Sequence, residues 1–586
     1  MRRNAFVLAL ALAALGAPVV SAAPPVPEVN SLTTILPRPC LPEPGNVHEA
    51  EWAEREGWAG PEYERYPGAC QRLRYVYGPI TVRPGQNDVL LEPVVVHKPG
   101  YDGFMTRFDP DLVKAADGTV PPIEEMHLHH GVWLSVNSYG EGLPFVFAGE
   151  EKTIFSLPRG FGMPVKATDD WELLYMIHSA VPQPTEVYIS WDVDYVAKDA
   201  AAAYGIKPAY PIWLDVRPGF YPVFNAQRGF GTNGTCTWPK QNCAAFDPYG
   251  DVIAGQGAPP NKPGTDLRLP SRGGSVGRIS NFQGGTLVHM AGHLHPGGVT
   301  NEVDLVRGGQ TRRIFTSEAL YWDRTDPTQT GGPPTSWDFS QTVSALPNWG
   351  VRVEPGDVFR SNATYDTTIQ SVYEAMGITL AWISPDTPAD QPTAPGVDPF
   401  AADTVRDPSL GCTSGGLLAA TPTLCDNGWV THGHLKENDN FGGPSGTLEA
   451  ERGSETDRVD IASFLYAPGD LSLVAMTGIP TVKRGSQLTF TNADAFANVY
   501  HSVTSCAWPC TGQTGTAFPV ADGATSSGRH IDFDSNELGF GVPTVSAAKN
   551  SNIWDLEIDS SYQPGEVVTY FCRIHPFMRG AFEVTS

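Results

Sequence analysis

The chain has 586 residues and a formal net charge of −25, with 39 Lys and Arg against 64 Asp and Glu. This acidic balance argues against nucleic acid or an anionic membrane surface as a partner, because both require clustered Lys and Arg. The length is too great for one hydrophobic core, so we predict three or four domains. After the N-terminus no stretch reaches ~18 uncharged apolar residues, so we predict no membrane span.

The N-terminus has the pattern of an export signal. Arg2 and Arg3 precede an uncharged apolar run over 5–17, and small residues follow up to Ala22, where we predict cleavage. The paired arginines leave the general secretory and the twin-arginine routes open. We therefore expect residues 1–22 to be removed as a signal peptide and the protein to be periplasmic or extracellular.

Nine cysteines in an exported chain should mostly form disulfides. Spacing alone does not prove connectivity, but neighbours in sequence suggest Cys40/Cys70, Cys236/Cys243, Cys412/Cys425 and Cys506/Cys510. Cys572 is left over. Because a free thiol is a liability outside the cell, we expect a bound group to hold it.

Strands between turns dominate the predicted secondary structure, because the chain has 61 Gly and 53 Pro and little long helical periodicity. A short helix is predicted near 47–58. The clearest strands are 186–196 and 372–382, in which alternate residues are apolar. Such one-sided patterns are typical of β-sandwiches, so the fold class is predicted as all-β.

Composition suggests where the domains begin and end. Residues 23–70 form a Pro- and Glu-rich N-terminal extension, and sandwiches are predicted over 71–200 and 205–387. Residues 388–455 are rich in Pro and Gly, which is typical of a linker. The strand pattern resumes over 456–586.

The last domain carries the ligand types of a blue-copper centre. Cys572, His575 and Met578 share one loop after a predicted strand, and His501 follows an earlier strand. A thiolate, two imidazoles and a weak thioether are the ligands of such electron-transfer centres. The loop Cys-x2-His-Pro-Phe-Met-Arg-Gly and the segment Tyr-His-Ser-Val resemble amicyanin-type cupredoxins. This resemblance implies a Greek-key cupredoxin β-sandwich over 456–586.

Two histidine clusters precede this domain. His129 and His130 follow His127 in the first predicted sandwich, and His293 and His295 lie in the second. In a strand His293 and His295 project from one face, as two ligands of one metal ion do. Neighbouring residues point to opposite faces, so joint ligation by His129 and His130 needs a twist or a bulge. By strand period alone, His127 and His129 would be the tidier pair.

The order of these elements, with His178 between the clusters and Met376 after them, resembles the type II copper, ascorbate-dependent monooxygenases. This family includes peptidylglycine hydroxylating and dopamine β-monooxygenases. The resemblance covers roughly 71–387. It implies two antiparallel jelly-roll β-sandwiches whose metal ions face each other across a solvent cleft.

By this resemblance two further copper ions have different roles. The ligands of the electron-transfer copper are His129, His130 and His178. The ligands of the catalytic copper, which activates dioxygen, are His293, His295 and Met376. With the type 1 centre, the chain would bind three copper ions, one for each ligand set. Core packing stays an alternative for His178 and Met376, because both lie on apolar strand faces.

Three other histidines have no assigned role. His289 shares the predicted strand face of His293 and is a possible additional member of that site. His432 and His434 form a third His-x-His in the predicted linker and match nothing in the family.

Departures from the family restrict the substrate. Peptide-amidating relatives carry Arg, Asn and Tyr where this chain has Ala291, Ile378 and Leu380. Without a guanidinium there is no bidentate clamp for a substrate carboxylate. We therefore expect a small, neutral or apolar substrate.

The resemblance implies an exported copper monooxygenase that hydroxylates a C–H bond with O2 as co-substrate. Electrons would come from an external donor, either a small reductant or a redox protein, and pass through the fused blue-copper domain. The alternative is a non-catalytic exported copper-binding electron-transfer protein. Copper content distinguishes them, because three copper ions per chain favour the enzyme and one favours the carrier.

Overall fold

The structure is a computed structural model that describes residues 37–41, most of 65–401 and most of 448–586. Its helices are short: α2 (Lys198–Ala203), α4 (Val474–Thr477) and the 3-10 helix η3 (Asp494–Ala497). Strands form nearly all the remaining regular structure, so the all-β prediction is confirmed. None of the helices in the described part of the chain has the length and apolar character needed to span a bilayer.

Several predicted features lie outside the described residues. They are the signal peptide, the helix near 47–58, the Cys412/Cys425 pair and the linker histidines His432 and His434.

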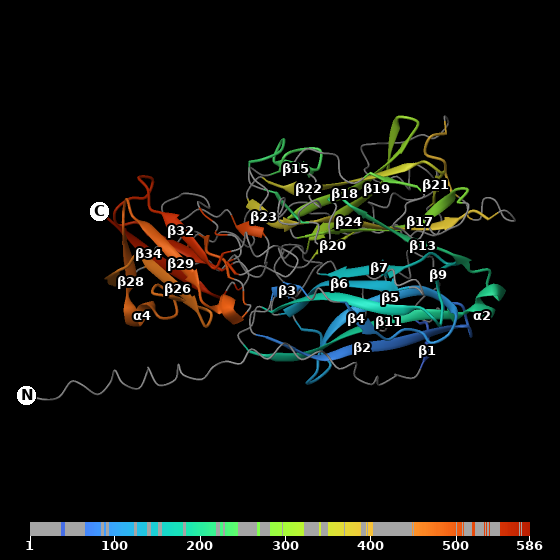
Figure 1. The fold of residues 1–586 in the computed structure, drawn as a ribbon, viewed down its shortest axis with the longest axis horizontal. Helices are drawn as coiled ribbons and strands as arrows, with labels where there is room; N and C mark the ends of the chain where they lie inside the picture. Colours follow the sequence, from blue (N-terminus) through green and yellow to red (C-terminus); the bar gives the residue numbers. More distant parts are fainter. Residues whose placement is uncertain are drawn as a thin grey trace, which may run out of the picture.

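The described residues form three bodies. The first, whose strands lie between residues 38 and 208, contains two sheets packed face to face (Figure 1). Its outer sheet has the order β1 (Arg38–Pro39), β2 (Cys70–Val82), β11 (Thr185–Ala197), β5 (Gly103–Lys114), β9 (Phe161–Val165) and β12 (Lys207–Pro208), with β8 (Phe155–Ser156) on β5. Its inner sheet has the order β3 (Asn87–Val89), β10 (Asp170–Ser179), β6 (Met126–Val136) and β7 (Gly142–Gly149), with β4 (Val94–Val96) on β10. The Trp133 ring of β6 joins the sheets, with its centroid 4.9 Å from that of Phe108 and 5.9 Å from that of Trp191.

The second body repeats this two-sheet arrangement. Its inner sheet has the order β13 (Tyr210–Asp215), β24 (Gly377–Pro385), β17 (Gly285–Leu294) and β21 (Val351–Val353). Its outer sheet has the order β15 (Thr235–Trp238), β22 (Val358–Asp366), β18 (Gly298–Arg307), β19 (Gln310–Tyr321) and β20 (Phe339–Gln341), with β16 (Leu267–Arg268) on β22. Cys236 and Cys243 form the predicted disulfide beside β15.

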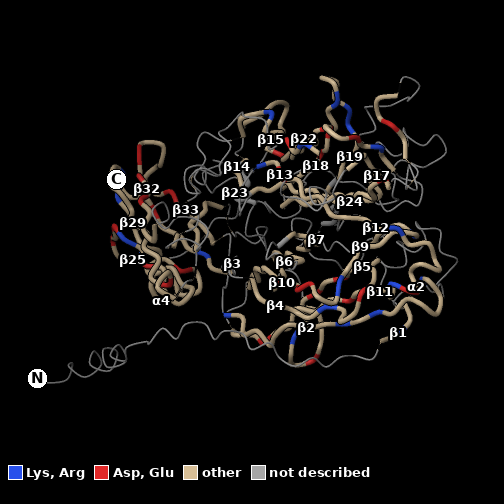
Figure 2. The backbone as a smooth tube through the Cα atoms, turned by 45° about the vertical axis from the view of Figure 1, so that its right-hand side comes forward, with Lys and Arg blue, Asp and Glu red and all other residues tan. Residues whose placement is uncertain are grey.

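The two inner sheets face each other, and β24 explains why. Every residue of β24 is buried. Ala381 and Ile383 pack into the core of the second body, whereas Ile378, Leu380 and Trp382 belong to a cluster shared with the first body. Strands β2, β5 and β11 contain Lys, Arg, Asp or Glu, whereas β6, β7 and β24 contain none of them (Figure 2). Burial of these uncharged faces therefore holds the two bodies together.

Strand β11 covers the predicted strand 186–196, but its pattern is not one-sided. The alternation places Asp192 and Asp194 on the face opposite the apolar residues, but both are buried as well. The Arg72 guanidinium donates to Asp194 at 2.7 and 3.1 Å, and Arg74 donates to Asp192 at 2.7 Å. The prediction failed here because long-range arginine partners let carboxylates occupy an interior position.

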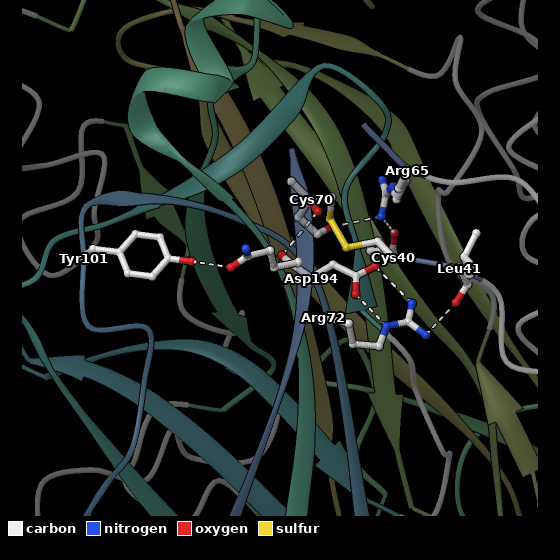
Figure 3. Close-up of a disulfide and its surroundings, with 10 residues drawn as sticks. Cys40, Leu41, Arg65, Cys70, Arg72, Tyr101 and Asp194 are labelled. Carbon is white, nitrogen blue, oxygen red and sulfur yellow. Dashed lines mark hydrogen bonds and ion pairs between the residues drawn. A yellow bond between two sulfur atoms is a disulfide. The ribbon is translucent and has the colours of Figure 1, made fainter. Parts of the chain in front are cut away.

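The segment 37–41 anchors against this charged layer (Figure 3). The predicted disulfide joins Cys40 to Cys70, and Arg72 donates a 2.8 Å hydrogen bond to the Leu41 carbonyl. Burial opposes ionisation of Asp194, but the charges of Arg72, Arg107 and Arg65 outweigh it and hold its pKa below the usual range.

The third body also has two sheets. One has the order β25 (Arg452–Glu455), β28 (Ile479–Lys483), β34 (Arg579–Thr585), β33 (Val567–Phe571) and β30 (Thr504–Ser505). The other has the order β27 (Leu465–Ala467), β26 (Arg458–Ala462), β29 (Gln487–Asn492) and β32 (Ile553–Glu557). Tyr570 and Phe490 join the two sheets, with ring centroids 5.4 Å apart.

One strand of the C-terminal segment belongs to the second body. β31 (Pro519–Ala521) pairs with β23 (Gln370–Ala375), which pairs in turn with β14 (Phe224–Ala226). The third body is thus attached to the second by a backbone ladder.

We predict that Arg72→Met destabilises the protein by about 3–5 kcal/mol, because it leaves the Asp194 carboxylate buried without its main partner. The depressed pKa of Asp194 contributes stability above about pH 4 that is lost as the pH falls through the folded-state pKa. The variant should lack this acid-sensitive contribution. Chemical denaturation at several pH values measures both effects.

Arg458→Met is the matched control, because both side chains of the Arg458–Asp460 ion pair are exposed. It should change stability by no more than ~1 kcal/mol. Equal losses of unfolding free energy in the two variants would show that the buried pair contributes no more to stability than the exposed pair.

Candidate metal centres

The third body brings three metal-binding atoms into one buried site. The His501 and His575 Nδ1 atoms lie 3.0 Å apart, and the Cys572 Sγ lies 3.8 and 3.6 Å from them, respectively. All three side chains are fully buried. The structure thus unites three of the four ligands predicted here, and the fourth, Met578, is also buried.

A tight loop after β33 positions these ligands. The Cys572 N–H donates to the Met578 carbonyl at 3.1 Å, and the Met578 N–H donates to the His575 carbonyl at 2.8 Å. His501 lies opposite, where its backbone forms a bridge with Leu538. Backbone hydrogen bonds therefore close the loop before any metal binds.

The surroundings favour the thiolate form of Cys572. The Ser502 N–H donates to its Sγ at 3.3 Å. Burial raises the pKa of the Cys572 thiol, but the hydrogen bond and charge of His501, with backbone N–H groups, bring it below the usual value. A thiolate is the form that binds metal ions, so the site is prepared for one.

Asp494 supports the site and was not predicted from the sequence. Its Oδ2 lies 3.0 Å from the His501 Nε2, and its carboxylate accepts hydrogen bonds from the Ser463 and Phe464 N–H groups. Carboxylates commonly orient metal-binding histidines in this way. Burial lowers the pKa of His501, but Asp494 and Cys572 raise it above its usual value overall.

A β-bulge in β6 places the second histidine group. His130 pairs with Met176 and Leu128 pairs with Ile177, so His129 is the extra residue between them. The bulge brings the neighbouring rings of His129 and His130 within 4.2 Å, centroid to centroid. The condition expected for joint ligation is therefore met.

The inner sheet of the second body brings its His-x-His pair to the same place. The His295 ring centroid lies 5.2 Å from that of His129 and 5.0 Å from that of His130. The Nε2 atoms of His130 and His295 are 2.9 Å apart. His293 lies beside them, with its ring centroid 5.3 Å from those of His130 and His295.

This arrangement differs from the expected cleft. His129, His293 and His295 are buried, and potential ligand atoms of His129, His130 and His295 lie within 4.8 Å of one another. The structure thus unites residues that the resemblance divides between two separated sites. The histidines of the two sets lie together because the two inner sheets, which contain the histidine-bearing strands β6 and β17, pack against each other.

His178 lies toward the third body. It pairs with His127 across β10 and β6, and their ring centroids are 5.0 Å apart. On its other side the His575 ring centroid is 6.3 Å away. The sequence left the role of His127 open. Its ring centroid lies 5.8 Å from that of His129.

Met376 lies between two strands and not within one. The predicted strand 372–382 is divided into β23 and β24, a correction that has a visible cause. The Tyr365 hydroxyl accepts the Met376 N–H at 3.1 Å and donates to the Met376 carbonyl at 2.8 Å. It also accepts the His295 N–H at 2.9 Å. Tyr365 therefore ties Met376 to His295, which sequence spacing did not indicate.

Aromatic and acidic side chains flank His293. The ring centroids of His293 and Phe147 are 5.4 Å apart, and the Trp213 Nε1 donates to the Asp215 Oδ2 at 2.8 Å. Burial raises the pKa of Asp215 to about 7, although Trp213 and His293 act to lower it. His289 packs edge-on against Phe155, with ring centroids 5.0 Å apart.

The remaining cysteines are structural where the structure describes them. Cys40 and Cys70 lie near Asp194, but their disulfide removes both sulfurs as thiolate ligands. Cys506 is disulfide-bonded, and Cys510 lies outside the described residues. Cys572 is the free and buried cysteine of the described part of the chain.

No protein-family model matches the chain. No curated protein matches it either. Among solved structures, a peptide-N(4)-(N-acetyl-β-D-glucosaminyl) asparagine amidase is 10% identical, with 54% of this chain and 97% of that chain covered at a TM-score of 0.26. The cowpea mosaic virus top component is 13% identical, with 53% and 88% covered at a TM-score of 0.20. Similarities at this level carry no functional information.

We predict that Tyr365→Phe weakens metal binding at the histidine group by at least about ten-fold, because the Tyr365 hydroxyl holds the backbone N–H of the ligand His295 in place. Loss of the hydroxyl should also cost about 1–3 kcal/mol of stability, since buried backbone groups lose their partner. Equilibrium dialysis and chemical denaturation measure the two effects.

Tyr101→Phe is the control, because the Tyr101 hydroxyl makes an exposed hydrogen bond to Gln71. It should leave metal affinity unchanged and shift stability by no more than about 0.5 kcal/mol. Unchanged metal affinity in Tyr365→Phe would reduce Tyr365 to a purely structural role.

Proposed function

We propose that the chain is an exported copper-dependent monooxygenase whose electrons pass from a blue-copper centre in the third body to copper held by the histidine group. The reaction would insert one oxygen atom of O2 into a C–H bond and reduce the other to water, with two electrons from an external donor and two protons from solvent.

The observation that carries this proposal is a continuous row of imidazoles between the two metal centres. The row runs from His575 to His178, His127, His129 and His295, with successive ring centroids 6.3, 5.0, 5.8 and 5.2 Å apart. Electron transfer slows steeply with distance, so a row of closely spaced rings supports transfer within the chain. A free-standing carrier would have no use for such a contact.

The burial of His575 supports the same direction of transfer. Its side chain is fully buried, between Phe464 and Phe577 on one side and His178 on the other. A ligand histidine covered by another part of the same chain favours an acceptor within this protein. An external donor would then approach the third body elsewhere.

The donor set in the third body fits copper. A thiolate and two imidazoles in one buried site, with Met578 in the same loop, match the ligand preferences of a blue-copper centre. Copper bound in these centres would supply one-electron chemistry and the activation of dioxygen.

The chain's own residues would orient the reactants and exclude water. Ala291, Ile378 and Leu380 are buried at the positions where peptide-amidating relatives carry polar side chains. They support a neutral or apolar substrate, because they offer no charge or hydrogen bond to a carboxylate. Tyr365 and the bulge at His129 would hold the ligands in place.

The disulfides favour a location outside the cytoplasm. The Cys40–Cys70 and Cys236–Cys243 disulfides need an oxidising environment to persist. This agrees with the signal-like N-terminus predicted from the sequence.

We predict that Cys572→Ser abolishes the intense visible absorption of the oxidised protein, because that colour requires a copper-bound thiolate. Copper should remain at the histidine group. Met578→Leu is the control and should stay coloured, since the axial thioether is a weak ligand. Absorption spectra with copper analysis test this, and a coloured Cys572→Ser protein would overturn the ligand assignment.

We further predict that Cys572→Ser loses oxygen uptake driven by a redox-protein donor but keeps uptake driven by a small reductant. A small reductant does not need the third body as a docking site, whereas the protein donor depends on the third body. Oxygen consumption by both proteins with both donors measures this. Equal rates with the protein donor would contradict the relay, and no uptake by the wild type with any donor and substrate would favour the carrier.

A further inference from the structure

We infer that His129 and His130 of the first body and His295 of the second hold one metal ion together, so that the two sandwiches share a single centre at their interface. This inference takes the identity of the metal, copper, from the proposed function. The ligand set rests on the structure alone.

Distances between donor atoms favour one ion. Metal–imidazole bonds are about 2 Å long, so two ligands of one ion lie no more than roughly 4 Å apart. The Nε2 atoms of His130 and His295 are 2.9 Å apart, which is inside this limit, and the potential ligand atoms of all three histidines lie within a looser 4.8 Å of one another. An ion placed between these two Nε2 atoms would be within bonding distance of both.

Both bodies fix their share of the ligands with backbone features. The bulge in β6 turns His129 and His130 toward the interface together, and it is flanked by regular pairing to β10. His295 directly follows β17, where its N–H is held by the Tyr365 hydroxyl at 2.9 Å. Two of the ligands therefore lie within a strand and the third lies directly after one, which limits the freedom of the ligands to separate.

The surroundings also suit a shared centre. The strands β6, β7, β17 and β24 around it carry no charged residue. A metal ion there would be bound by neutral imidazoles in a poorly solvated interface. His293 lies next to the group as a further imidazole.

A shared ion would cross-link the two sandwiches. Ligands that bind only the assembled form stabilise it by mass action, so metal removal should loosen the interface as well as empty the site. The remaining pair, His127 and His178, would then lie between this centre and His575.

The test compares copper content in His130→Ala, His295→Ala and the double variant, each in the full chain. Under a shared centre each single variant loses the same copper ion, and the double variant loses no more than either. Under separate centres the losses add, so the double variant loses one ion more than each single variant. Additive losses would overturn the inference, as would full copper retention in either single variant.

His97→Ala is the matched control, because His97 is a half-buried histidine after β4, and it should keep all its copper. The visible absorption of the Cys572 centre reports in every variant that the third body is folded and loaded. If an alanine variant fails to fold, His130→Gln and His295→Gln repeat the comparison with polar side chains.

Failure of the inference and failure of the proposed function have different signatures. Additive losses would leave a copper enzyme with two separate histidine centres. A wild-type protein that binds copper only at Cys572 would overturn both.

Discussion

Strand β24 has apolar side chains on both faces, and each face needs a partner that excludes water. One face joins the core of the second body through Ala381 and Ile383. The other, with Leu380 and Trp382, is covered by the first body, where the Trp382 ring stacks on that of Phe155 at 4.6 Å, centroid to centroid. Because the histidine-bearing strands β6 and β17 belong to these same facing sheets, the burial of β24 also determines where the histidines meet.

Histidines at such an interface have two opposing effects on stability. A buried imidazole loses its hydration, and this loss costs free energy unless a partner compensates it. A metal ion that binds several imidazoles provides that compensation and depends on the assembled interface. The same logic applies to Asp194, where an arginine takes the place of the metal ion. In both places a polar group enters the interior only together with its partner.

The sequence predicted local features better than long-range ones. The Cys572 loop was predictable because three ligands lie within seven residues, and the all-β class followed from alternation and turn residues. The need for a twist or bulge at His129 followed from strand geometry once the resemblance had paired His129 with His130. The grouping of His130 with His295 was not predictable, because it depends on how two sheets pack across 165 residues of sequence. Tyr365 and Asp194 were missed for the same reason, since their partners are distant in the chain.

The pairing of β31 with β23 changes how the third body is joined to the rest. A linker tethers two domains with a range of separations, so that its length would set how often the centres meet. A strand ladder allows one register, since a shift by a single residue would turn every side chain to the other face. The approach of His575 to His178 is therefore constrained by backbone hydrogen bonds in an antiparallel sheet that contains strands of both bodies. Removal of the third body together with β31 would therefore expose the edge of β23 that β31 covers.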